Sequence, residues 1–384
     1  MTGMLAGTRV LDLTTVGPGA RCAALLADLG AEVIKVGPPP SANRIVPADW
    51  AYSAGRGTRR LGVNLKDEAA RDAVLALAAT CDVLLEGFRP GVAARLGLGY
   101  DALRKASEAI VYASLTGYGQ DGPYAQRAGH DINYQAAAGV LSLQGRAANG
   151  APTIPGATLA DSAGGGMHAA LSICAALVRR ATTGQGCHLD VAAVDGMVWA
   201  NSLMLDEYLA TGVEHGPRTN ILTGRYAAYD VYACADGKYV TVGAIELEFF
   251  SNLCRLLGVP ELAELARDDG RQDEVRAQIA AAFATRPRDE WVQLLADEDT
   301  CVAPVLSPSE VVADPHLRAR GLVTEVAVGG QRFGQIGRPI AGSDVPPEGE
   351  HGVPFSHSDA RHLLVGAGVD DATIDDLIAR EVLR

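Results

Sequence analysis

Short apolar runs alternate with amphipathic segments along the first third of the chain. Four runs have the length and aliphatic character of buried strands: residues 9–14, 31–36, 82–86 and 110–116. Three intervening segments carry apolar residues at the i, i+3, i+4 spacing of helices: residues 19–29, 67–79 and 101–107. Strands that alternate with helices predict an α/β fold, a doubly wound domain built on a parallel sheet.

The hydrophobic pattern changes further along the chain. The middle predicts helices at 129–143 and 161–182, a strand at 187–193 and a long helix that reaches about residue 209. After Gly216, two alternating runs at 225–233 and 238–245 flank Asp236-Gly237, which is a strong hairpin signal. Helices are predicted next at 246–257, 272–285 and 288–297, so this region is expected to form a smaller α+β domain.

Domain boundaries follow from these changes of pattern. We expect a large domain over 1–200, a small domain over 220–320, and linkers at 201–219 and 321–330. The tail, 325–384, contains strand-like pieces around Gly329-Gly330 and a helix at 370–382. We expect this tail to return to the large domain.

Composition narrows the function. The 384 residues carry 33 basic and 46 acidic side chains, and this net charge of −13 argues against a nucleic acid or an anionic membrane as partner. The 7 cysteines are scattered and the 8 histidines form no convincing ligand pairs, so neither a disulfide framework nor a metal site is expected. No signal-peptide pattern and no membrane span are visible, and the cytoplasm is the expected compartment.

Glycines follow the first predicted strand and open the next helix. A Gly17-Pro18-Gly19 turn in this place can be part of a dinucleotide-binding fingerprint. Cys22 occupies the third small position, however, and the second strand does not end in an acidic residue that could bind a ribose. A tight turn that leads into a packed helix is therefore the better interpretation.

Basic residues of the first domain gather in the segments that follow predicted strands. Loops after parallel strands converge on one edge of the sheet, where ligands bind. Arginines at this edge of an acidic protein suggest recognition of phosphate groups, although a solvated charged face is an equal alternative for each of them. The residues concerned are Arg56, Arg59, Arg60, Lys66, Arg89 and Arg95.

Three further positions carry ionisable side chains in suggestive surroundings. His130 lies between Gly129 and Asp131, and a histidine can take and give a proton at neutral pH, although a structural role is more common. Asp161 precedes Gly164-Gly165-Gly166, which suits a helix N-cap but also a site that a ligand or another backbone approaches closely. Glu246 ends the second hairpin strand, where it could equally be a helix-capping acid.

Together these motifs resemble the family III coenzyme A transferases, and within them the α-methylacyl-CoA racemases. The Gly-His-Asp-Ile-Asn-Tyr string at 129–134 and the Ala-Ile-Glu string at 244–246 are the most specific features and belong to the racemase branch. The matching stretches are 25–36, 82–99, 116–120, 127–134, 159–166, 240–246 and 301–306.

The resemblance implies a fold and an assembly. The family has a large Rossmann-like domain and a smaller domain joined by two linkers. Two chains interlock as linked rings, so the resemblance implies a homodimer with each active site between the large domain of one chain and the small domain of the other.

The resemblance also implies roles for particular residues. His130 and Asp161 correspond to the two acid–base residues, Glu246 of the partner chain to the acid that orients them, and Asp131 to a supporting residue. The residues expected to hold coenzyme A and the thioester are Val63, Asn64, Leu65, Lys66, Gly87, Phe88, Arg89, Arg95, Gly129, Ile132, Asn133 and Tyr134. No metal and no cofactor is implied, because coenzyme A enters as part of the acyl-CoA thioester substrate.

Two departures from the racemase pattern stand out. Pro38 replaces a usual arginine, and an arginine of the 56–60 cluster is the expected substitute for the lost phosphate contact. Thr223-Gly224-Arg225-Tyr226-Ala227 replaces a usual Asp-Gly-Gly-Ala-Pro, which weakens the assignment to racemases and leaves the acyl group open.

Two reactions remain open. Inversion of a carbon next to a thioester needs a base on one face and an acid on the other, and His130 and Asp161 can exchange these roles. A CoA transferase would instead use Asp161 as a nucleophile and would not need His130. Residues 220–260 contain no run of four glycines of the kind expected to cover Asp161 in a transferase, which favours the racemase.

Overall fold

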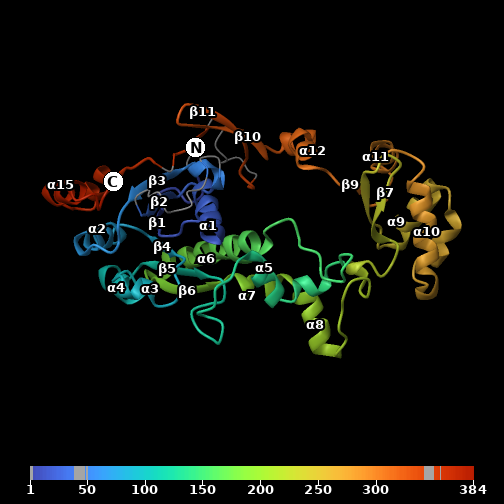
Figure 1. Cartoon of the computed structure of the whole chain (residues 1–384), viewed down its shortest axis with the longest axis horizontal. Helices are drawn as coiled ribbons and strands as arrows, with labels where there is room; N and C mark the ends of the chain where they lie inside the picture. The colour runs from blue at the N-terminus through green and yellow to red at the C-terminus, as the bar shows by residue number, and fades with distance from the viewer. Residues whose placement is uncertain (1–2, 39–47, 49–50, 341–349, 355) are drawn as a thin grey trace. The chain divides into compact units, whose positions relative to one another are not determined.

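The computed structural model describes residues 3–38, 48, 51–340, 350–354 and 356–384 (Figure 1). The chain forms two compact units. Unit 1 comprises Met1–Ala138, Ala157–Asn201 and Pro315–Arg384, and unit 2 comprises Gly139–Gly156 and Ser202–Asp314. The C-terminal segment thus belongs to the same unit as the N-terminal domain.

Unit 1 is built on a six-stranded sheet in which all the neighbouring strands are parallel. Its order, β3-β2-β1-β4-β5-β6, is that of a doubly wound Rossmann-type sheet, so the predicted α/β class is confirmed. The strands are β1 (Arg9–Asp12), β2 (Glu32–Gly37), β3 (Thr58–Gly62), β4 (Val83–Glu86), β5 (Val111–Thr116) and β6 (Cys187–Ala192).

Both faces of this sheet are covered by helices. Successive strand residues point to opposite faces, so Val10 packs with the core on one side and Leu11 with the core on the other. Helices α1 (Gly17–Asp28) and α6 (His168–Thr183) cover the first side, where Leu26 and Ile173 are buried. Helices α2 (Glu68–Ala78), α4 (Tyr100–Ala106), α14 (Ala360–Gly366) and α15 (Asp371–Ala379) cover the second.

Two predicted helices that cross from unit 1 into unit 2 differ from the sequence prediction. The helix expected at 129–143 ends early, as α5 (Asp131–Ala137), and Gly139 then turns the chain at a φ of 79° into the 3-10 helix η2 (Val140–Leu143). The long helix expected to reach residue 209 is divided into α7 (Ala193–Ala200) and α8 (Ser202–Thr211). Unit 1 also contains η1 (Tyr52–Gly55), α3 (Val92–Arg95) and η3 (Ala160–Met167), a π-helix.

Unit 2 contains the predicted hairpin. Strands β7 (Tyr229–Ala233) and β8 (Tyr239–Gly243) pair antiparallel, which confirms the hairpin expected around Asp236-Gly237. Strand β9 (Val302–Pro304) pairs antiparallel with β8. Besides η2 and α8, the helices of this unit are η4 (Ile221–Thr223), α9 (Leu247–Leu257), η5 (Pro260–Leu265), η6 (Asp269–Arg271), α10 (Gln272–Phe283), α11 (Arg288–Leu295) and α12 (Pro308–Ala313).

The C-terminal segment begins with α13 (Pro315–Ala319) and adds a second small sheet to unit 1. Its order is β11-β10-β12, formed by β10 (Val323–Val328), β11 (Gln331–Ile336) and β12 (Glu350–His351). Strand β10 therefore occupies most of the stretch 321–330 that was expected to be a linker. Within the described part of the chain, no helix has the length and apolar character needed to cross a membrane.

Candidate active site

A cavity of about 580 Å³ opens at the carboxyl ends of the parallel strands of unit 1, and we call it the main cavity. Its walls come from the segments that follow β1 to β5, together with the start of α5 and Asp161 of η3. The carboxyl edge of a doubly wound sheet is the usual place for a ligand. The lining residues are 13–19, 36–38, 63–66, 87, 88, 92, 96, 115–117, 129, 130, 134 and 161.

The β1–α1 loop forms one wall of the main cavity. Asp12 is fully buried, and its Oδ1 accepts hydrogen bonds from the Thr14 backbone N–H at 2.8 Å and from Thr14 Oγ1 at 2.6 Å. Gly19 packs so tightly on this threonine that a β-carbon would lie 2.4 Å from its side chain. The glycines therefore make the predicted tight turn, and this turn also lines the cavity.

His130, the residue directly before α5, lines the main cavity. Its backbone N–H donates to Asn133 Oδ1 at 3.0 Å, which fixes the beginning of the helix. Tyr134 is buried one turn later and donates from Oη to the Gly129 carbonyl at 2.6 Å. Burial raises the pKa of Tyr134 to about 12, so this hydroxyl keeps its proton at neutral pH.

Asp161 lies inside the π-helix η3 and not at an N-cap, as one interpretation of the sequence had it. Its backbone N–H donates to Asp131 Oδ1 at 2.9 Å. The side chain faces Gly17, where a β-carbon would lie 3.4 Å from Asp161 Oδ2. Partial burial raises the pKa of the Asp161 carboxyl, as does the Asp131 carboxylate, while Arg21 and His130 oppose this shift.

The glycines after Asp161 allow helices to pack. A β-carbon on Gly165 would lie 2.6 Å from Pro18 of α1, and one on Gly164 would lie 2.7 Å from the Ala193 carbonyl of α7. Gly196 approaches Gly164 in turn, with 2.1 Å between a β-carbon on Gly196 and the Gly164 carbonyl oxygen. Of the two explanations offered by the sequence, the close approach of other backbones is thus the one observed here.

Most of the residues expected to hold coenzyme A and the thioester line the main cavity: Val63, Asn64, Leu65, Lys66, Gly87, Phe88, Gly129 and Tyr134. The lining does not include Arg89, Arg95, Ile132, Asn133 or Asp131. Asp131 instead accepts a hydrogen bond from the Asp161 backbone. The Phe88 turn is fixed by Glu86, whose Oε2 accepts the Phe88 backbone N–H at 2.8 Å. The sequence thus located the segments better than the individual side chains.

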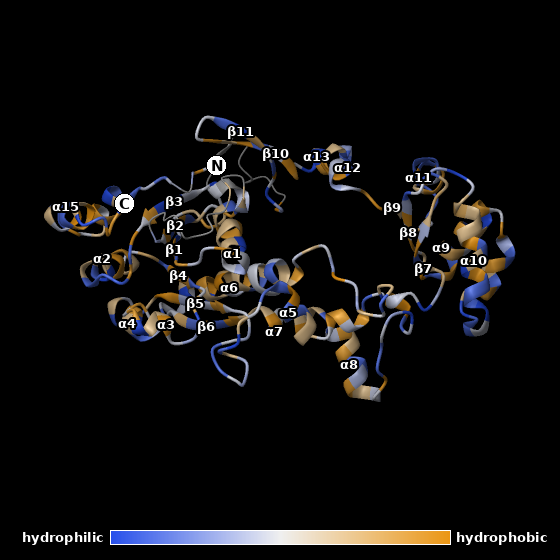
Figure 2. Ribbon diagram, viewed as in Figure 1, coloured by the Kyte–Doolittle hydropathy of each residue, from blue (hydrophilic) through white to orange (hydrophobic). Residues whose placement is uncertain are grey.

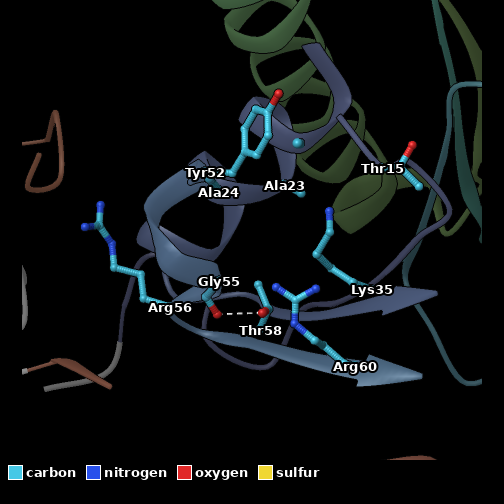
Figure 3. A pocket seen from close by; sticks show the side chains of 10 residues that line it. Thr15, Ala23, Ala24, Lys35, Tyr52, Gly55, Arg56, Thr58 and Arg60 are labelled. Atoms are coloured by element: carbon cyan, nitrogen blue, oxygen red, sulfur yellow. Dashed lines mark hydrogen bonds between the residues drawn. The ribbon is translucent and has the colours of Figure 1, made fainter. Parts of the chain in front are cut away.

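The arginine cluster forms a second site of a different kind. A cavity of only about 10 Å³, which we call the polar cavity, is lined by Lys35, Tyr52, Arg56 and Arg60 among others (Figure 3). Arg56 is 4% exposed and makes a bidentate ion pair with Asp28, Nε to Oδ1 and Nη2 to Oδ2, both at 2.8 Å. Lys35 pairs with the buried Asp12.

These contacts correct the expectation that this cluster supplies a phosphate contact in place of the arginine missing at Pro38. Pro38 lines the main cavity, whereas Arg56, Arg59 and Arg60 do not. Arg59 pairs with Glu32 through Nε and Oε1 at 2.8 Å, and Arg60 donates from Nε to the Val353 carbonyl at 3.3 Å. Their hydrogen bonds serve the packing of unit 1.

Glu246 belongs to unit 2, where it precedes helix α9 as its N-cap residue. The segment that departs from the racemase pattern, 223–227, also lies in unit 2. There Arg225 pairs with Asp269 through two hydrogen bonds, at 2.8 and 2.7 Å. A single chain therefore brings His130, Asp131 and Asp161 together in unit 1 and carries Glu246 on the other unit.

Some lining residues escaped the sequence analysis. Thr14, Thr15, Val36 and Gly117 line the main cavity but were not named as candidates. The signal that could have found them is their position, because each lies at or just after the carboxyl end of a predicted strand.

Comparisons with known proteins agree with this architecture. The model of CoA-transferase family III matches residues 5–359. Human alpha-methylacyl-CoA racemase is 38% identical over 319 residues, which cover 83% of this chain and 81% of the racemase. Human succinyl-CoA:glutarate CoA-transferase is 32% identical over 338 residues, which cover 84% of this chain and 76% of the transferase.

A solved structure extends the similarity to the fold. The crystal structure of a CAIB/BAIF family protein from Brucella suis matches with a TM-score of 0.79 at 28% identity, over 96% of this chain and 100% of the other. Family match and fold agree across both units, and the chain belongs to CoA-transferase family III.

Proposed function

We propose that this protein is an acyl-CoA racemase that inverts the α-carbon of a 2-methylacyl-CoA thioester by proton transfer between two bases. The observation that carries the proposal is that His130 and Asp161, two groups able to take or give a proton, line the same cavity. The similarity to the human racemase at 38% identity supports it. In this reaction one residue removes the α-proton and the other returns a proton to the opposite face of an enolate.

The electrostatics of Asp161 suit such a role. Partial burial and, after it, the nearby Asp131 carboxylate raise the pKa of Asp161, so its protonated form becomes accessible closer to neutral pH. A carboxyl that both accepts and donates a proton during turnover needs this property. Asp131 is proposed as a supporting residue, because it accepts the Asp161 backbone N–H.

Coenzyme A is proposed to bind as part of the substrate, with no further cofactor. Residues 63–66 and the Gly87-Phe88 turn line the main cavity and offer a path for the pantetheine arm. Lys66 is the cation of this lining, and Arg89, which is exposed, follows directly after Phe88. Both are candidates for contacts with the phosphates, since Arg and Lys are the usual phosphate ligands.

We also propose a cytoplasmic homodimer in which Glu246 of the partner subunit completes the site. Two helices offer apolar surface for such an assembly. Leu171 and Val178 lie one above the other on α6 and are 70% and 71% exposed. Helix α8 is largely hydrophobic (Figure 2) and yet has no buried residue in the single chain. Light scattering at micromolar concentration tests the dimer: a mass near 40 kDa would contradict it, because one chain has 39.9 kDa.

A CoA transferase is the second candidate, and the similarity to succinyl-CoA:glutarate CoA-transferase favours it. In that reaction the Asp161 carboxylate attacks the thioester carbonyl and CoA leaves as a thiolate, which gives a mixed anhydride. The thiolate then attacks the Asp161 carbonyl and releases the first acid. The resulting enzyme–CoA thioester passes its CoA to a second acid by the reverse sequence.

Proton NMR in deuterium oxide separates the two reactions. The purified protein is incubated with a (2R)-2-methylacyl-CoA, once alone and once with a free carboxylic acid. We expect the α-proton signal to disappear without any acceptor, because racemisation exchanges this proton with solvent. If the α-proton persists and the acceptor's CoA thioester forms, the protein is a transferase and the proposal is wrong.

A further inference from the structure

A buried glutamine binds Asp131, which in turn binds the backbone of Asp161 at the main cavity. Gln135, on α5, is 1% exposed and donates from Nε2 to Asp131 Oδ2 at 2.6 Å. The other oxygen, Asp131 Oδ1, accepts the backbone N–H of Asp161 at 2.9 Å. Both oxygens of the Asp131 carboxylate therefore accept a hydrogen bond, one from the Gln135 side chain and one from the Asp161 backbone.

The second polar atom of Gln135 shows what this arrangement costs. Among the described residues, Gln135 Oε1 is buried without a hydrogen-bond partner. A buried acceptor without a partner is unfavourable, and an apolar side chain of similar size would avoid this cost. An amide at this position is thus poorly explained by packing, whereas the short bond from its Nε2 to Asp131 gives it a purpose.

We infer that Gln135 is a positioning residue that fixes the Asp131 carboxylate against the backbone of Asp161. Two hydrogen bonds link these residues: the Gln135 amide donates to the Asp131 carboxylate, and the Asp161 backbone N–H donates to the same carboxylate. Asp131 and Gln135 are one helical turn apart on α5, so the helix itself sets their spacing. Asp161 lies on η3, and the two hydrogen bonds therefore join α5 to an element that is distant in sequence.

The consequence is electrostatic. The Asp131 carboxylate is one of the causes that raise the pKa of Asp161, and its effect depends on a short and constant separation. Without the Gln135 donor, Asp131 can rotate away and this effect weakens. This part of the inference deepens the proposed function, because it concerns the residue assigned there as an acid and base.

Other charged groups around Asp161 bound the expected change. Arg21 of α1 and His130, just before α5, lower the pKa of Asp161, and both residues are retained in the Gln135 variants. Helices α6 and α7 and strand β6 also contact η3. Their charged groups His168 and Asp190 act on the pKa of Asp195 of α7. The Gln135 variant is thus expected to change one contribution among several.

The test is a carbon-13 NMR titration of aspartate carboxyls in the full chain without substrate. The Asp161 signal is identified as the one missing from Asp161→Asn. In Gln135→Met, whose side chain has a similar length and no donor, we expect the Asp161 titration to shift to lower pH by about 0.5–1 unit. Asp131→Asn should shift it in the same direction, since it removes the like charge.

A double variant shows whether Gln135 acts through Asp131. If it does, Gln135→Met should add nothing to the shift of Asp131→Asn. Gln272→Met is the matched control: Gln272 is also buried and hydrogen-bonded, but its amide binds backbone groups of Ala227, Leu265 and Asp268 and no carboxylate, so the Asp161 signal should not move. If Gln135→Met does not fold, Gln135→Asn keeps the amide but shortens its reach, and the same shift is expected.

Two outcomes would overturn the inference. One is an Asp161 titration that stays at the wild-type position in a folded Gln135 variant, and the other is a shift that persists in the Asp131→Asn background. Because the titration needs no substrate, it is independent of the proposed reaction. Failure of α-proton exchange in the wild type would contradict the proposed function and leave the result on Gln135 unaffected.

Discussion

Two cavities of unit 1 use ionisable residues in opposite ways. The main cavity has a volume of about 580 Å³ and exposes His130 and Asp161 to a possible ligand. The polar cavity, about 10 Å³, is lined by Lys35, Arg56 and Arg60, whose partners include buried carboxylates and backbone carbonyls. Thr15 lines both, so the two cavities adjoin at the β1–α1 loop.

The comparison separates charge that does chemistry from charge that holds the fold together. A buried arginine with a bidentate carboxylate partner already has its charge paired inside the fold, so it is poorly placed to bind a phosphate. A carboxyl beside another carboxylate in a half-buried place is unfavourable for stability, and such groups are typical of functional sites. Asp161 has the second environment and Arg56 has the first.

The largest effect is expected for the two proposed acid–base residues. His130→Ala and Asp161→Asn should each lower the rate of racemisation by about 10²–10⁴, because each removes a positioned proton-transfer group. Racemisation is measured by chiral chromatography of the hydrolysed acyl group. His362→Ala and Asp72→Asn change exposed residues of unit 1 outside the main cavity and serve as matched controls. Activity retained by both active-site variants would place the chemistry elsewhere.

The next effect concerns stability. Arg56→Met removes the bidentate partner of the buried Asp28 and leaves this carboxylate only the 3.6 Å contact with Arg338 among the residues that the structure describes, so the free energy of unfolding should fall by up to about 3–5 kcal/mol. Arg59→Met breaks a half-exposed pair with Glu32 and should cost no more than about 1 kcal/mol. Denaturant titration measures both. Equal effects of the two substitutions would show that the polar cavity is not a stabilising centre.

A smaller effect is expected on coenzyme A binding. Arg89→Ala should weaken the affinity for CoA about tenfold, in a salt-dependent manner, because one charge-assisted hydrogen bond to phosphate is lost. Arg104→Ala, at an exposed position of α4, is the control. Calorimetry at two salt concentrations measures the affinity for CoA and its dependence on salt. Unchanged affinity in Arg89→Ala would remove this residue from the proposed binding site.

The smallest effect is on the pH profile. As a base, Asp161 must be ionised, so the rate should fall as the pH falls through its pKa, which lies above the ordinary value of 3.8. Asp131→Asn removes a like charge, and the acid limb of the profile should then move to lower pH. Initial rates between pH 4 and 8 measure this limb. A shift to higher pH would contradict the proposed influence of Asp131.

The sequence predicted the large sheet because its strands are apolar and regularly spaced. Strand β3 was missed as a strand, since Thr58–Gly62 contains Arg59 and Arg60 and lacks a clear apolar pattern. Its role depends on pairing with β2, and such a contact is formed only in the folded chain. The π-helix at Asp161 was also missed, because the close packing of Gly164 and Gly196 that accompanies it involves separate helices.

For the candidate site, the sequence predicted the lining segments but not the partners of individual side chains. The positions that follow strand ends identified the lining segments, because topology brings the carboxyl ends of parallel strands together. Partners distant in sequence could not be predicted in the same way. The Arg56–Asp28 pair and the bond between Asp131 and the Asp161 backbone span 28 and 30 residues, and no local pattern distinguishes them from free side chains.

His130 and Asp161 are proposed to act as bases on opposite faces of one α-carbon. The most direct test is deuterium incorporation from each pure enantiomer, (2R) and (2S), followed by proton NMR for His130→Ala and for Asp161→Asn. We predict that each variant loses exchange from one enantiomer and that the two variants lose opposite ones. Unchanged exchange from both enantiomers in His130→Ala would contradict the claim.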